Sequence, residues 1–270
     1  MTDLWSDLLR CLQLRPVGDD GSLAVFEGSN QQLEYHRVFG GQILGQFVTA
    51  ARATCPDKTV KSLHTLFPKE GRADEPLRIE AARRHEGRTF ATLAITATQS
   101  SGVVAAASVS MHAAEDGPDR QDIGAEVPPL LGAEHRADIG LIPWEIRTLG
   151  GLDDEAAGPP DYEMWMRTPE VDPELGPALV AYATDLTLIG TALRPLEGLS
   201  QRGAQTAYTS AVTSHTVWFH RPLRTDNWLL LRQHSPLLAH GRAFGRGDVL
   251  TEDGTLVASY AQESLVRLRK

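Results

Sequence analysis

The 270-residue chain has little of what marks secreted or membrane-spanning proteins. It contains two cysteines, Cys11 and Cys55, which are too few for a disulfide framework and lie outside any C-x-x-C motif. No apolar run approaches the roughly 18 to 20 residues that a membrane span requires. The N-terminus also lacks the basic start and uninterrupted apolar stretch of a signal peptide. We therefore expect a cytoplasmic protein without a membrane span.

Positive charge and metal-ligand patterns are scarce as well. The formal net charge is −9, which argues against a nucleic-acid partner because contact with many phosphates requires a basic face. The histidines and cysteines show no clustered ligand spacing, so neither a metal site nor a cofactor is predicted. A G-x-S-x-G elbow is absent, and the neighbouring Ser214 and His215 should point to opposite faces of a strand. A Ser-His-Asp nucleophile is therefore disfavoured.

An imperfect internal repeat is the most informative feature that is present. The matching stretches are 62–68 with 214–222, 87–90 with 241–244, and 102–108 with 254–259. The hydrophobic content of 41% is enough for one large core or two ordinary ones. A tandem duplication lets one copy keep reactive groups while the other changes, so differences between the copies indicate where the chemistry lies.

Each copy combines one central helix with a series of strands. The first copy opens with an amphipathic segment at 4–14 and has a helix at 38–51, with Gly40 and Gly41 near its start. Its strands are predicted at 60–67, 77–81, 89–98 and 103–111.

The second copy repeats this order. Strands at 144–148 and 162–168 precede a helix at 178–188, which begins after Gly176 and Pro177. Further strands are predicted at 211–219, 228–233, 242–250 and 256–267. These patterns predict an α+β protein in which an antiparallel sheet wraps around a helix twice, a double hotdog. The predicted domains are residues 1–113 and 141–270, joined by a linker at 114–140 that is rich in acid, proline and glycine.

Three motifs carry a family resemblance. They are His-Arg-Val-Phe-Gly-Gly-Gln at 36–42, Ser-His-Thr-Val-Trp-Phe-His-Arg-Pro at 214–222, and Asp-Gly-Thr-Leu-Val-Ala-Ser-Tyr-Ala-Gln-Glu at 253–263. With these motifs the sequence resembles the acyl-CoA thioesterase II (TesB-like) family over roughly residues 5 to 268. The resemblance implies a double hotdog hydrolase of fatty acid and lipid metabolism, which cleaves fatty acyl-CoA to free fatty acid and CoA. It also implies that an Asp, a Thr or Ser, and a Gln hold the attacking water.

Two of those three family residues match this sequence. The Asp corresponds to Asp185 and the Gln to Gln262, whereas the hydroxyl position falls on Val212, which cannot bind a water. Because side chains alternate along a strand, Ser210 and Ser214 share the predicted face of Val212, while Thr213 would need a bulge. Ser214 is the better substitute of the two because it is nearer to His215. The loss of one hydrogen bond costs on the order of 1 kcal/mol, so we expect a slower enzyme.

Comparison of the copies supports these assignments. Thr49 stands opposite Asp185, and Met111 stands opposite Gln262, so the first copy lacks both polar groups. The first copy instead has the glycine-rich helix start, where the backbone N–H near Gly41 is the predicted oxyanion donor. His64 and His215 recur in both copies, which favours a structural role for them.

Other features leave the function more open. Arg221 and Arg242 are candidate ligands for the CoA phosphates. Val212 keeps a non-catalytic acyl-CoA binding protein as an alternative. A hotdog enoyl-CoA hydratase is disfavoured because its Asp is followed five positions later by His, and position 190 is Gly. The exposed sheet edges of fused hotdogs favour a homodimer.

Overall fold

The computed structural model describes residues 3–33, 36–123, 126–204 and 206–269. Contacts divide the chain into two compact units that differ from a simple division into sequence halves. The first unit contains Met1–Asp119, Glu174–Ala183 and Thr216–Phe219. The second unit contains Arg120–Pro173, Thr184–His215 and His220–Lys270. Two short segments of the predicted second copy are thus packed with the first.

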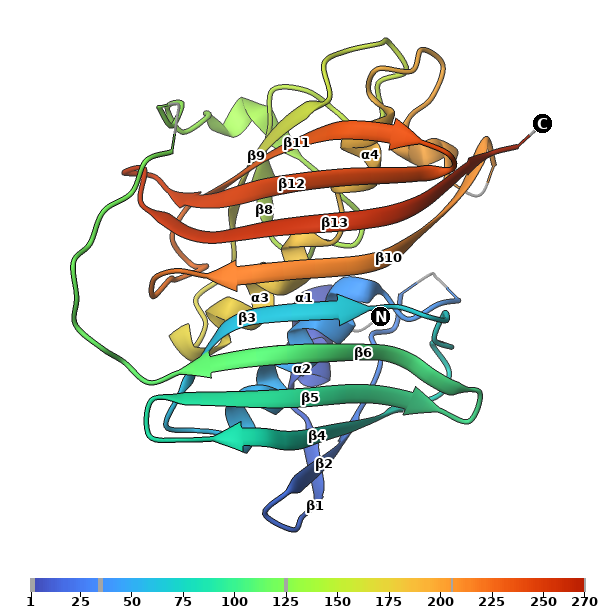
Figure 1. The fold of residues 1–270 in the computed structure, drawn as a ribbon. Coiled ribbons are helices and arrows are strands. Elements are labelled where there is room, and N and C mark those ends of the chain that lie inside the picture. Colours follow the sequence, from blue (N-terminus) through green and yellow to red (C-terminus); the bar gives the residue numbers. More distant parts are fainter. Residues whose placement is uncertain (1–2, 34–35, 124–125, 205, 270) are drawn as a thin grey trace. The chain divides into compact units, whose positions relative to one another are not determined.

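The first unit is an antiparallel sheet with a long helix on its inner face (Figure 1). The strands follow the order β1-β2-β4-β5-β6-β3. Its helices are α1 Leu4–Leu12, α2 Gly40–Thr54 and α3 Gly176–Thr184, the last of which ends one residue beyond the unit. Its strands are β1 Arg15–Asp19, β2 Leu23–Gly28, β3 Thr59–Leu66, β4 Leu77–Glu86, β5 Phe90–Gln99 and β6 Gly102–His112.

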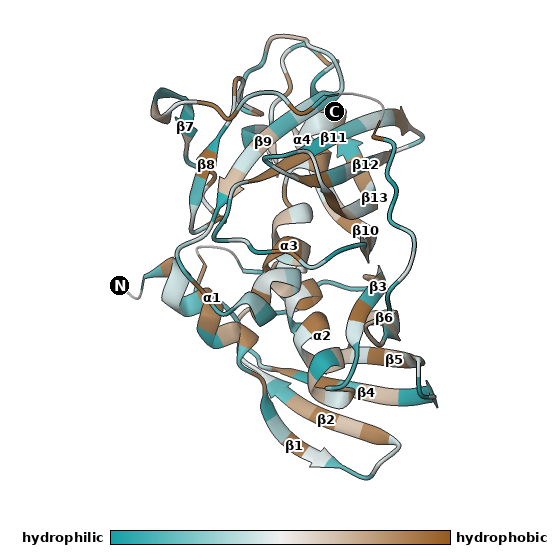
Figure 2. Ribbon diagram, turned by 90° about the vertical axis from the view of Figure 1, so that its left-hand side faces the viewer, coloured by the Kyte–Doolittle hydropathy of each residue, from teal (hydrophilic) through white to brown (hydrophobic). Residues whose placement is uncertain are grey.

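Helix α2 is the centre of this unit, because most of its buried side chains are apolar or small and its two buried glutamines, Gln42 and Gln46, are hydrogen-bonded. Phe47, Val48 and Ala51 are fully buried, and α2 packs against β2 to β6. The facing strands bury alternate residues, as in β5, where Leu93 and Ile95 point toward the core. Figure 2 shows α2 above the alternating hydrophobic bands of β4 and β5. This arrangement is one hotdog.

Two glycines on one face of α2 let α3 approach closely. A Cβ at Gly41 would lie 2.5 Å from the backbone oxygen of Tyr182, and a Cβ at Gly45 would lie 3.1 Å from that of Ala178. Residues four apart lie on the same side of a helix, so both glycines face α3. The ring of Phe39 packs edge-on against Tyr182 at 5.0 Å. Small residues on α2 therefore determine where α3 lies.

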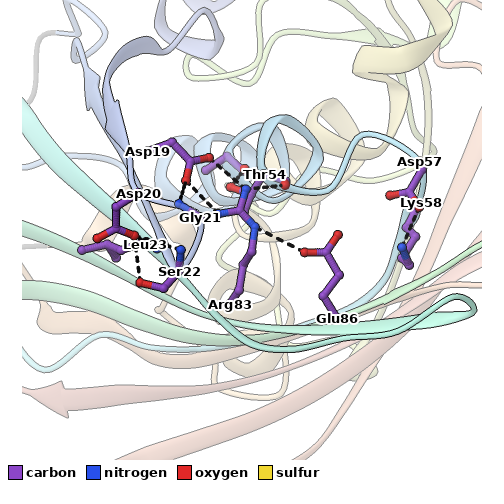
Figure 3. A network of polar contacts seen from close by, with 11 residues as sticks. Asp19, Asp20, Gly21, Ser22, Leu23, Thr54, Asp57, Lys58, Arg83 and Glu86 are labelled. Carbon is purple, nitrogen blue, oxygen red and sulfur yellow. Dashed lines mark hydrogen bonds and ion pairs between the residues drawn. The ribbon is translucent and has the colours of Figure 1, made fainter.

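Arg83 on β4 ties the other end of α2 to the β1–β2 hairpin (Figure 3). Its guanidinium donates to the carbonyl of Thr54, the last residue of α2, at 2.9 Å and to both carboxylate oxygens of Asp19 at 3.0 and 2.9 Å. Glu86 lies 3.4 Å from the same guanidinium. A positive charge at the carboxyl end of a helix is favourable, because the unpaired carbonyls there carry partial negative charge.

The second unit repeats the sheet with a shorter helix. Its strand order is β10-β13-β12-β11-β9-β8-β7, and α4 Leu188–Leu193 packs against β11, β12 and β13. The strands are β7 Arg136–Ala137, β8 Glu145–Arg147, β9 Asp161–Arg167, β10 Tyr208–Phe219, β11 Leu229–Ala239, β12 Arg242–Thr251 and β13 Leu256–Leu268. The 3-10 turns are η1 Ala133–His135, η2 Pro173–Leu175 and η3 Gln201–Gly203. The α+β double hotdog prediction is confirmed.

The structure differs from the predicted second helix. The expected helix at 178–188 is interrupted: α3 ends at Thr184, Asp185 lies in a turn, and α4 starts at Leu188. The consecutive helical segments Pro173–Leu193 are also long and apolar enough to cross a membrane by composition, with a mean hydropathy of 1.2. Since 78% of the most apolar window is buried in the fold, the segment has the character of a core helix.

The predicted linker is partly a structural element. Its residues Ile123, Val127, Leu130 and Leu131 pack against a cluster in the second unit that contains Trp165, Trp228, Leu230 and Leu250. The segment from Arg120 onward therefore belongs to the second unit.

Candidate active site

Asp185 and Gln262 are both buried in the second unit, although their sequence positions are far apart. Asp185 lies in the turn between α3 and α4 and is 4% exposed, and Gln262 on β13 is 2% exposed. Charged and amide side chains are rarely buried without a specific use. Their common burial in one unit makes them candidates for chemistry.

The imidazole of His215 on β10 connects the two. Its Nδ1 lies 2.9 Å from Oε1 of Gln262 and 3.7 Å from Oδ1 of Asp185. Its Nε2 lies 3.0 Å from Oγ1 of Thr184, the last residue of α3. The distances to Gln262 and Thr184 are those of hydrogen bonds, and the distance to Asp185 brings the carboxylate within ion-pair range. His215 is therefore the centre of the predicted site, although the repeat favours only a structural role for it.

His215 is neutral at neutral pH in this environment. It is fully buried, and burial lowers its pKa to about 4, although the hydrogen bond to Gln262 acts in the opposite direction. A neutral imidazole has one N–H donor and one nitrogen acceptor. The ring can therefore orient its neighbours without adding a charge to the site.

A second layer of polar and aromatic side chains holds this group. Gln262 donates from Nε2 to Oγ of Ser264 at 2.9 Å. Tyr260 stacks near the imidazole with a centroid distance of 6.2 Å, and its hydroxyl donates to Gln233 at 2.8 Å. Burial raises the pKa of Tyr260, so this phenol remains protonated. The neighbours of His215 are thus fixed by strands β11 and β13.

Among the described residues of the first unit, the positions that match Asp185, Gln262 and His215 do not form such a group. Thr49 donates to the carbonyl of Gly45 within its own helix, and Met111 is fully buried. When Phe67 is aligned with Phe219, the residue opposite His215 is Leu63, which is fully buried. The two copies therefore differ at three site positions rather than two.

His64 and His215 are not equivalent, which corrects the sequence comparison. His64 is exposed, lies 3.4 Å from Oγ1 of Thr216 and packs edge-on against Trp218 at 5.5 Å. His215 is on the buried face of β10, with Val217. A shift of one residue in the repeat exchanges the two faces of a strand. Sequence reasoning missed His215 for this reason, although alignment on the phenylalanine would have found it.

The other predicted residues lie in different settings. Ser214 is half-buried beside His215 on β10, and among the described residues it has no hydrogen bond to Asp185, His215 or Gln262. The neighbouring Thr213 donates to the carbonyl of Glu263 at 3.0 Å. The polar group next to Gln262 on β10 is therefore His215, and the substitute role of Ser214 stays a prediction.

Gly41 and the two arginines have structural uses. Gly41 permits the close approach of α3 described above, and its role as an oxyanion donor stays a prediction. Arg221 donates to Gln121 at 3.0 Å and to the carbonyl of Leu256, so it holds the linker segment. Arg242 pairs with Glu263 at 3.1 Å and is exposed. CoA binding by Arg221 and Arg242 stays a prediction.

Comparison with known proteins identifies the family and agrees with the fold. The model of the acyl-CoA thioesterase N-terminal domain matches residues 31–112, and that of the acyl-CoA thioesterase C-terminal domain matches residues 109–266. The chain belongs to the acyl-CoA thioesterase II (TesB-like) family. Acyl-CoA thioesterase 2 of Haemophilus influenzae is 29% identical and the match covers 99% of both chains.

Solved structures of this family and fold are also similar. An acyl-CoA thioesterase II from Mycobacterium marinum is 31% identical with a TM-score of 0.76, covering 97% of this chain and 98% of that one. A hot dog fold protein of unknown function from Alicyclobacillus acidocaldarius is 19% identical with a TM-score of 0.75 over 97% of this chain and 98% of that one. The second likeness concerns the fold alone.

Proposed function

We propose that this acyl-CoA thioesterase hydrolyses fatty acyl-CoA through a water that Asp185 activates and Gln262 orients. The activity of the family is thioester hydrolysis, which yields a free acid and CoA. The observation that supports the residue assignment is the buried group of Asp185, His215 and Gln262, in which one imidazole contacts both predicted residues.

The proposed reaction needs no covalent enzyme intermediate. The Asp185 carboxylate accepts a proton from water while the water oxygen attacks the thioester carbon. The carbonyl oxygen becomes negatively charged and requires an N–H donor, for which the Gln262 amide is the candidate in the second unit. The backbone N–H near Gly41 stays the donor that the sequence predicts. Collapse of the tetrahedral intermediate breaks the carbon–sulfur bond, and the proton held by Asp185 passes to the CoA sulfur. The acid and the thiol then leave.

The hydroxyl missing at Val212 is the feature that favours the non-catalytic alternative. A valine cannot donate to a water, so an acyl-CoA binding protein without turnover would tolerate this residue. Asp185 and Gln262 are both present, however, and both are buried beside an uncharged imidazole. Burying a carboxylate costs free energy, and a protein that only binds acyl-CoA would not need this arrangement. We therefore place hydrolysis first.

Release of free thiol from acyl-CoA tests the proposal directly. Short, medium, long and branched acyl-CoAs are incubated with the protein, and the thiol is measured with a chromogenic disulfide reagent. We expect release from at least one chain-length class. Acyl-CoA binding with no release from any member of the panel would establish the non-catalytic alternative. Enoyl-CoA hydration in the absence of thiol release would establish the hydratase.

We also infer a cytoplasmic homodimer that acts in lipid metabolism. The inference rests on the family chemistry and on the sheet edges at β1 and β7, which end the strand order of their units. Light scattering coupled to size-exclusion chromatography measures the mass in solution. A mass near 29.4 kDa would contradict the dimer.

A further inference from the structure

His215 contacts every polar side chain on which the proposed chemistry depends within the second unit, and the family motif assigns it no role. Its two nitrogens reach Gln262 and Thr184 at hydrogen-bond distance, and Asp185 lies 3.7 Å from Nδ1. A buried histidine with only a packing role needs no such set of partners. The assignment below rests on the proposed function of Asp185 and Gln262.

The proton of the neutral imidazole has a preferred position. Oε1 of Gln262 and Oδ1 of Asp185 both lie on the Nδ1 side, and a carboxylate and an amide oxygen can only accept. A proton on Nδ1 is therefore attracted by both groups, whereas a proton on Nε2 would leave Nδ1 facing acceptors without a hydrogen. The hydroxyl of Thr184 then donates to Nε2.

This proton position determines which end of the Gln262 amide is available. When Nδ1–H donates to Oε1, the amide oxygen is occupied and the amide nitrogen points toward Ser264. An amide nitrogen carries two hydrogens, and Ser264 takes one. The group that Gln262 can present to a substrate is therefore its second N–H. Were the amide reversed, the carbonyl would face the substrate instead.

We propose that His215 is a positioning residue that fixes the Gln262 amide so that an N–H is directed at the attacking water or at the thioester oxygen. The copy comparison supports this independently. The first unit has Leu63 where the second has His215, and it also has Met111 where the second has Gln262. The histidine and the amide that it orients are absent together.

Two substitutions separate positioning from packing. His215→Asn places an amide N–H close to the former Nδ1 and can still donate to Gln262, whereas His215→Leu fills similar volume without a donor. We expect His215→Leu to lower kcat by about 100-fold with KM changed by less than about twofold. Without the imidazole N–H the Gln262 amide is no longer held in place, so its N–H no longer stabilises the transition state. His215→Asn should keep kcat within about tenfold of the wild type.

A spectroscopic measurement tests the proton position without turnover. In protein labelled with ¹⁵N at histidine, long-range ¹H–¹⁵N spectra should show His215 with a hydrogen on Nδ1 and a bare Nε2 at pH 7. Circular dichroism and melting temperature establish that both variants are folded. If His215→Leu does not fold, the activity of His215→Asn and the position of the proton in the spectrum still test the positioning role of His215.

The outcomes are distinct from those of the proposed function. A proton on Nε2, or asparagine and leucine variants that are equally impaired while folded, would overturn the positioning role. A leucine variant with wild-type kcat would do the same. A wild-type protein that releases no thiol overturns the hydrolase assignment, whereas the proton position is read from the spectrum in either case.

Discussion

The proposed general base is the carboxylate of Asp185. It lies in a turn where the predicted helix is broken, so its position is set by the end of α3 and the start of α4. Asp185→Asn keeps the shape of the side chain but removes the proton acceptor. We expect kcat to fall by about 10² to 10⁴-fold, the usual contribution of a general base, while the melting temperature changes little.

The control for this prediction is a carboxylate of the same unit outside the site. Asp248 on β12 accepts a hydrogen bond from Ser259 at 2.6 Å. Asp248→Asn should leave kcat unchanged in the thiol-release assay. Equal activity of Asp185→Asn and the wild type would remove Asp185 from the mechanism.

The burial of His215 also makes stability depend on pH. Its pKa is about 4 in the folded protein and 6.5 in an ordinary environment, so between these values only the unfolded chain binds the proton. Stability therefore falls as the pH decreases from about 6.5 to about 4, by about 3 kcal/mol in total. Above about pH 6.5 this contribution is fully present.

Urea unfolding at several pH values measures this dependence. His215→Asn should flatten the loss of unfolding free energy between pH 6.5 and 4, because asparagine does not titrate. His64→Asn, which replaces the exposed histidine of the first unit, should retain the wild-type slope. If the slope of His215→Asn equals that of the wild type, the neutral buried state of His215 is wrong.

At the scale of elements, the long strands could be predicted because alternating β-branched residues mark them within a few positions. The missed elements include β1 and β2, the short β7 within the predicted linker, and α4 beyond the predicted helix. The turn between β1 and β2 did carry a signal, since Asp20 accepts from the N–H groups of Ser22 and Leu23, and Gly21 has a positive φ of 85°. The break at Asp185 did carry a signal in Thr184, Asp185 and Thr187, which favour helix ends over helix interiors, but the apolar residues on both sides are compatible with a continuous helix.

Two residues of the candidate site were predicted from the family resemblance, and the comparison with their repeat partners supported them. Asp185 and Gln262 oppose Thr49 and Met111 in the first copy. His215 was hidden because His64 stands one position away from its equivalent. Which of two adjacent residues faces the core depends on strand register, and a sequence comparison of one repeat does not determine that.

An element-scale prediction concerns the contact between β4, α2 and the β1–β2 hairpin. Arg83→Met removes the guanidinium that donates to Thr54 and Asp19 in Figure 3. Since the side chain is 16% exposed, we expect the free energy of unfolding to fall by about 1 to 2 kcal/mol. Denaturant titration measures this change.

Arg78 provides the matched control on the same strand. It pairs with Glu80 at 2.9 Å, but both side chains are considerably exposed, at 54% and 36%. Exposed ion pairs contribute little, so Arg78→Met should change stability by less than about 0.5 kcal/mol. Equal effects of the two substitutions would show that Arg83 acts as one more surface charge and does not anchor the helix end.

At the scale of the whole chain, the segment between the sequence repeats divides into two parts. The part before Arg120 belongs to the first unit, and the part after it packs on the second. Val127 belongs to the apolar residues that cover Trp165, Trp228 and Leu250. A simple linker does not need apolar side chains. The part of the segment after Arg120 therefore completes the core of the second unit.

Val127→Asp tests this division of the segment. A carboxylate placed against the tryptophan cluster would be desolvated without a partner, so the variant should lose about 1 to 3 kcal/mol of unfolding free energy, the cost of burying an unpaired polar group. Ala114→Asp introduces the same charge at an exposed position in the earlier part and should be neutral. Calorimetry measures both variants. If the two substitutions have the same effect, residues 120–131 are a connection only, and the second unit is complete without them.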